Sequence, residues 1–109
     1  MSAALPEAVE AYLQAKFDEN ADGLAALFAE DAVVHDENRD HAGRAAIRDW
    51  AAGVSAAYDI TRTVTGTTVH GPAALVRVRV AGNFPGSPVD LHHHFTVADD
   101  RIAALTICP

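Results

Sequence analysis

The stretch LFAEDAVVHDENRDHAGRAAIRDWAAG, residues 27–53, contains the pattern that decides the fold. Its segment AVVHDE, residues 32–37, is short and rich in β-branched residues, which predicts a strand. The polar segment NRDHAG, residues 38–43, is predicted to be a connection. A helix with one apolar stripe is predicted to follow, marked by Ala46, Ile47 and Trp50. The stretch therefore predicts a strand, a turn and an amphipathic helix in close succession.

The flanking residues extend this pattern to an α+β fold. Pro6 fits the first turn of one helix, and Asn20 is a candidate cap for a second, short helix. Helical spacing is seen for Val9, Tyr12, Leu13 and Phe17, and again for Leu24, Leu27 and Phe28. Strands are predicted for residues 60–69, with a candidate bulge at Gly66, and for residues 74–81, 89–98 and 101–108. This order predicts helices packed on one face of a mostly antiparallel sheet.

Length and composition limit the classes of protein to consider. With 109 residues, the chain is expected to form a single domain over residues 1–109. The formal net charge of -7 argues against binding to nucleic acid or to an anionic membrane surface. Cys108 is the single cysteine, so no internal disulfide is expected. Neither a signal peptide nor an apolar stretch long enough for a bilayer is apparent, and a cytoplasmic protein is expected.

Three consecutive histidines, His92 to His94, lie inside the strand predicted for residues 89–98. Because strand side chains alternate between faces, His93 shares an apolar face with Phe95, whereas His92 and His94 point the other way. The three cannot act together from one regular strand. A metal site on His92 and His94 would need a third ligand that no spacing identifies, so no metal is expected.

Residues 27–53 also resemble the SnoaL-like families of the nuclear transport factor 2-like and ketosteroid isomerase-like superfamily. The resemblance rests on Phe28, the acidic pair Glu30 and Asp31, the strand that ends at Asp36, and Gly43 before the helix. It implies a cone-shaped α+β barrel in which a strongly bent sheet wraps three helices around a pocket. It also implies a homodimer packed through the outer sheet face, to which a last strand with Ile102 and Ala104 on one face and Leu105 and Ile107 on the other would contribute.

The resemblance implies catalytic roles for three residues. Asp36 falls where ketosteroid isomerases keep their general base, and Tyr12 falls where they keep the tyrosine of the oxyanion hole. His93 falls where they keep a protonated aspartic acid, which is a departure from the pattern. From the residues alone, Asp36 is read as a cap of the following turn and His93 as a core histidine bonded through its ring nitrogens, and the alternative for Tyr12 is a core tyrosine.

The predicted function is binding of a small hydrophobic molecule, with Trp50, Val34, Phe84, Phe95 and His41 as candidate ligand-binding residues. One hypothesis is an isomerase, cyclase or dehydratase that needs no cofactor and transfers a proton next to a carbonyl. The alternative is a non-catalytic ligand-binding or accessory domain, and a protein-interaction domain is a third reading without a partner motif. An epoxide hydrolase would need an Asp-Arg-Asp set on the inner face, for which Arg62 is the only nearby arginine.

Overall fold

The computed structural model describes residues 5–57 and 60–109, except for the side chains of residues 54–57. Along the chain, the elements are α1 (Glu7–Phe17), α2 (Ala21–Ala25), β1 (Phe28–Asp36), β2 (Arg39–Ala42), α3 (Arg44–Ala57), β3 (Ile60–His70), β4 (Ala73–Gly82), β5 (Val89–Ala98) and β6 (Arg101–Cys108). Within the described residues, no helix has the length and apolar character needed to cross a bilayer.

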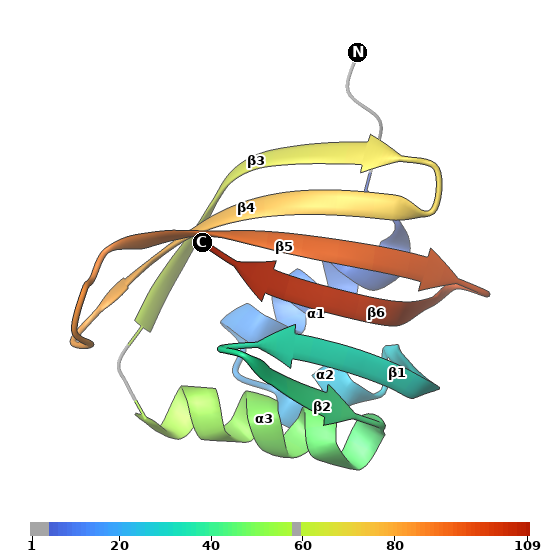
Figure 1. Ribbon diagram of the computed structural model, residues 1–109, viewed down its shortest axis with the longest axis horizontal. Helices are drawn as coiled ribbons and strands as arrows, with labels where there is room; N and C mark the ends of the chain where they lie inside the picture. Colours follow the sequence, from blue (N-terminus) through green and yellow to red (C-terminus); the bar gives the residue numbers. More distant parts are fainter. Residues whose placement is uncertain (1–4, 58–59) are drawn as a thin grey trace.

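The strands form one curled sheet in the order β2-β1-β6-β5-β4-β3. Only the pair between β1 and β6 is parallel, and the other pairs are antiparallel. Figure 1 shows the three helices gathered against one side of the sheet, with α3 running along β1 and β2. The predicted α+β fold, with three helices inside a bent and mostly antiparallel sheet, is confirmed, although the sheet curls without closing on itself.

The segment around the first strand is more extended than the sequence predicted. Phe28 begins β1 instead of ending a helix, because α2 stops after one short turn. Residues 39–42, predicted to be a connection, form the edge strand β2. Asp36 pairs with Arg39, and His35 pairs with Asp40. Glu37 and Asn38, which connect Asp36 to Arg39, both adopt left-handed backbone angles. This two-residue turn matches strand twist, so it folds the polar segment back along β1 as a hairpin.

Register shifts in two strands decide which side chains face the helices. The bulge predicted at Gly66 is confirmed by the shift in pairing between β3 and β4. A second shift, in β6, pairs Ile102 with Val97 and Leu105 with Phe95. Ile102 therefore lies on the same inner face as Leu105, and both are buried. The prediction that they occupy opposite faces is wrong, because the extra residue of the bulge was not recognised in the sequence.

The homodimer stays a prediction. Because Ile102 and Leu105 lie on the same face of β6, the last strand no longer supports it by being apolar on both faces. We still expect self-association through the outer sheet face, on the strength of the family resemblance. Sedimentation at micromolar concentration would then give twice the chain mass of 11.5 kDa. A mass equal to one chain would contradict the prediction.

Candidate functional site

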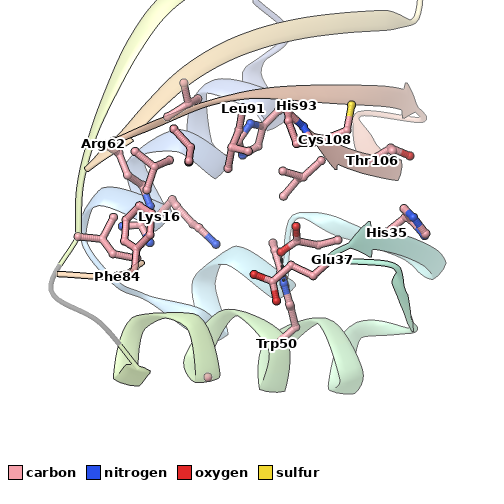
Figure 2. Close-up of a pocket in the computed structure, with 18 of the residues that line it drawn as sticks. Lys16, His35, Glu37, Trp50, Arg62, Phe84, Leu91, His93, Thr106 and Cys108 are labelled. Carbon is pink, nitrogen blue, oxygen red and sulfur yellow. Dashed lines mark hydrogen bonds between the residues drawn. The ribbon is translucent and has the colours of Figure 1, made fainter. Parts of the chain in front are cut away.

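A cavity of about 980 Å³ lies between the helices and the inner face of the sheet. Figure 2 shows Lys16 of α1, Trp50 of α3, Arg62 of β3 and His93 of β5 directed toward this space, with Phe84 at one end. Tyr12 and Asp36 also line it. The cavity thus collects polar side chains from five elements, α1, β1, α3, β3 and β5, which are far apart in the sequence.

The predicted site residues divide into two groups. The cavity is lined by Tyr12, Asp36, His93, Trp50 and Phe84. The structure places Val34, Phe95 and His41 outside this lining. Val34 and Phe95 are packed in the core, and the His41 ring lies beside Trp50 with 5.9 Å between ring centroids. The three candidate catalytic residues therefore face one space, and three of the five candidate ligand contacts do not.

The carboxylate of Asp36 is held by a side chain of α3. The indole Nε1 of Trp50 donates a hydrogen bond of 3.0 Å to Asp36 Oδ2. Asp36 is the last residue of β1, where the strand meets the cavity, and Trp50 is almost completely buried. This bond fixes the orientation of the carboxylate and leaves Oδ1 without a protein donor among the described side chains. The sequence analysis placed both residues in the site but did not foresee the bond between them.

Tyr12 and His93 place buried, unsatisfied polar atoms in the wall of the cavity. Tyr12 is fully buried, His93 is 6% exposed, and their ring centroids are 6.3 Å apart. Neither the Tyr12 hydroxyl nor His93 Nδ1 has a hydrogen-bond partner among the described residues. A buried polar atom without a partner typically costs about 1–3 kcal/mol. The reading of His93 as a core histidine satisfied by hydrogen bonds therefore does not hold for Nδ1.

Burial keeps both groups neutral. It raises the pKa of Tyr12 above its ordinary value, and the nearby Asp36 charge adds to this effect while Arg62 opposes it. Burial also lowers the pKa of His93 to about 3, assisted by the positive charges of Lys16 and Arg62. At neutral pH, the site therefore offers a hydroxyl and an uncharged imidazole, each able to donate one hydrogen bond.

Lys16 is a buried, charged lining residue that the sequence analysis did not single out. It is 9% exposed, whereas Phe17, predicted to lie on the apolar stripe of α1, is 46% exposed. The sequence pattern favoured Phe17 as the buried residue because only apolar residues were counted. Lys16 nevertheless stands four residues after Tyr12 and thus on the same helix face. The Lys16 Nζ lies 4.1 Å from the centroid of the Trp50 ring, as in a cation–π contact. Burial, followed by the charge of Arg62, lowers the pKa of Lys16 to about 8.

The histidine run is arranged as strand alternation predicted. His93 is buried and stacks near Phe95, whereas the His92 and His94 rings stack on each other at 6.4 Å. Within the described part of the chain, no group of three metal-binding side chains is present.

A pH dependence of stability follows from the neutral state of His93. As pH falls below about 6.5, the unfolded chain binds a proton at this residue, while the folded chain does so only near pH 3. This contribution to stability is complete above pH 6.5 and is lost as pH falls. We expect wild type to lose on the order of 3 kcal/mol more than His93→Gln between pH 7 and pH 4, as measured by urea unfolding.

His94→Gln is the matched control for this measurement, because it removes an exposed imidazole from the neighbouring position of the same strand. It should unfold with the same pH dependence as wild type. If His93→Gln also kept that pH dependence, a neutral His93 in the folded protein would be ruled out.

Comparisons with known proteins agree with this architecture. The chain is 43% identical to a candidate polyketide cyclase from Sinorhizobium meliloti, over 95% of both chains and with a TM-score of 0.91. A protein from Catenulispora acidiphila with a ketosteroid isomerase-like fold, solved with trimethylamine, is 22% identical, over 97% of this chain and 87% of that chain, with a TM-score of 0.85.

A third solved structure is SalBIII, an epoxide hydrolase/cyclase-like enzyme of pyran ring formation in the polyether salinomycin. It is 18% identical, over 93% of this chain and 86% of that chain, with a TM-score of 0.80. A comparison with curated protein sequences finds no match. The family model for the SnoaL-like domain matches residues 9–105. Because this match spans nearly the whole chain, the protein belongs to the SnoaL-like family.

Proposed function

We propose that the cavity binds a small, largely apolar ketone and that the protein moves a proton next to its carbonyl group, without a cofactor, as an isomerase or cyclase. The observation that carries this proposal is the convergence of Asp36, Tyr12 and His93 on one cavity, with Asp36 oriented by Trp50. A carboxylate base facing uncharged hydrogen-bond donors is the set of groups that enolisation requires.

The first step assigns the base. Asp36 Oδ1 removes a proton from the carbon beside the carbonyl, and the electron pair of that C–H bond moves into an enolate. The Trp50 indole keeps the carboxylate in place during this transfer, because it remains bonded to Oδ2. Fixing the base against its target removes much of the entropic cost of the step.

The second step assigns the donors. The enolate oxygen receives a hydrogen bond from the Tyr12 hydroxyl, and a second from the His93 N–H when the ring proton faces the cavity. Asp36 then returns the proton to another carbon in an isomerase. In a cyclase, the enolate carbon instead attacks a second carbonyl carbon of the same molecule. The ring C–C bond forms as the π bond of that carbonyl breaks, and the resulting alkoxide takes the proton from Asp36. Low polarity around these donors strengthens their effect on the developing charge.

The relatives support a cyclase most directly. The candidate polyketide cyclase is similar enough over nearly all of both chains to make intramolecular C–C bond formation the first reaction to test. The similarity to SalBIII is too low to transfer an epoxide reaction. In this chain, Arg62 is the arginine of the cavity lining, and Asp36 is a half-buried aspartate of the same lining.

A second candidate function is ligand binding without turnover. The observation in its favour is that the Tyr12 hydroxyl and His93 Nδ1 are both closed off by neighbouring atoms. A ligand that does not reach these two atoms would be oriented by Asp36 and the cations of the cavity without contacting the oxyanion donors.

Deuterium exchange separates the two functions. We expect the protein to accelerate exchange of the protons beside the carbonyl of α-tetralone in D₂O, followed by proton NMR. Asp36→Asn should reduce the acceleration by about a hundredfold to ten-thousandfold, because the general base is lost. Tyr12→Phe should reduce it by a smaller factor, since His93 still donates to the enolate.

Asp31→Asn is the control, since it replaces an exposed carboxylate on the same strand, β1. It should exchange at the wild-type rate. Calorimetric binding of the ketone without any acceleration would support the binding function instead. Acceleration that survives Asp36→Asn would contradict the assignment of the base.

A further inference from the structure

Two positive charges face the cavity without an ion-pair contact to any carboxylate of the described residues. Lys16 reaches into it from α1 and Arg62 from β3, as Figure 2 shows. Among the described residues, no carboxylate forms an ion pair with either side chain, and neither donates a hydrogen bond to another side chain. Lys16 is held by the face of the Trp50 ring, which attracts the ammonium group but leaves its remaining N–H donors directed away from the ring.

The two cations are close enough to repel each other. The charge of Arg62 contributes to lowering the pKa of Lys16, and burial lowers the pKa of Arg62 itself. Burying like charges together is costly unless a counter-charge is supplied. A folded site with this arrangement is therefore prepared for an anion that the protein does not provide.

The other charged groups around the two cations offset only part of their charge: Asp36 acts on Lys16, and the exposed Glu19 acts on Arg62. Those that line the cavity come from β1 and the turn after it, from α3 and from β5: Asp36, Glu37, Asp49 and His93. Asp36 Oδ2 accepts the bond from Trp50, and Asp49 pairs with Arg48. Glu37 is exposed in the hairpin turn, and His93 is uncharged. The inner part of the cavity thus contains two cations and one carboxylate, which leaves one positive charge for a ligand to neutralise.

We propose that Lys16 and Arg62 form a carboxylate-binding subsite, so that the ligand of this cavity is an oxo acid rather than a neutral ketone. This inference rests on the proposed use of the cavity as a ligand site and adds the charge of the ligand. A carboxylate accepts two hydrogen bonds in a plane from a guanidinium group and a further one from an ammonium group.

The position of this subsite also limits the shape of the ligand. Tyr12 and Lys16 stand four residues apart on α1, which corresponds to a rise of about 6 Å along one helix face. A ligand whose carbonyl oxygen faces Tyr12 and whose carboxylate faces Lys16 would bridge two side chains that leave the helix about one turn apart. Oxo acids with two or three carbons between the ketone and the carboxyl group span this separation.

A matched pair of probes tests the inference. 3-Benzoylpropionate carries a ketone and a carboxylate separated by two methylene groups, and 3-benzoylpropionamide is its uncharged counterpart. We expect calorimetry at pH 7 to show that the carboxylate binds about tenfold to hundredfold more tightly, the range typical of hydrogen bonds to charged groups. Lys16→Met, which keeps the length of the side chain, should abolish this preference, and Arg62→Met should weaken it.

Arg39→Gln is the control for net charge, because Arg39 is an exposed residue of the edge strand β2. It should keep the wild-type preference. Equal affinity of wild type for both probes would overturn the carboxylate subsite and leave the proposed function standing. Binding of neither probe would count against both proposals.

A measurement on the unaltered protein provides a second test. Lys16 loses its proton as pH rises through about 8, so the preference for the carboxylate should decline between pH 7 and pH 9.5. The affinity for the amide should change little over this interval. A carboxylate preference that stays constant to pH 9.5 would exclude Lys16 as its source.

Discussion

The ring of Tyr12 joins helix α1 to the sheet, and the position of the site depends on this contact. It meets Phe28 of β1 and Phe95 of β5 edge to face, with ring centroids 6.1 and 5.1 Å apart, and it also contacts the ring of His93. Because Tyr12 is completely buried among these rings, the rotation of α1 about its own axis is fixed. That rotation turns Lys16 into the cavity and leaves Phe17, which also lines the cavity, 46% exposed.

The site combines several features that oppose stability. An unpartnered hydroxyl, an unpartnered imidazole nitrogen and a buried ammonium group all face one cavity. Each would be relieved by a ligand that offers an acceptor oxygen or a negative charge at the right place. Functional sites are typically the places where a protein keeps such unfavourable groups. The well-packed fold around them holds their geometry in spite of the cost.

Much of the fold could be predicted from local patterns. The alternation in VDLHHHFTVA placed His93 on the inner face, and the position of Asp36 at the end of a strand brought it to the cavity. The β6 bulge was not predictable, because it arises from pairing with β5 and not from its own residues. The burial of Lys16 was missed for a similar reason. Its aliphatic stem fits a buried helix face, but only the packing of α1 shows that this face is used. The bond from Trp50 to Asp36 depends on the approach of α3 to β1.

The position of Trp50 has a consequence for spectroscopy. It is the only tryptophan of the chain, and its indole is almost fully buried, bonded to Asp36 and covered by Lys16. Intrinsic fluorescence excited in the tryptophan band therefore originates at the wall of the cavity. The emission is sensitive to the charge on either side of the ring, so the protein carries a built-in optical reporter of what occupies its site, without a label or an added chromophore.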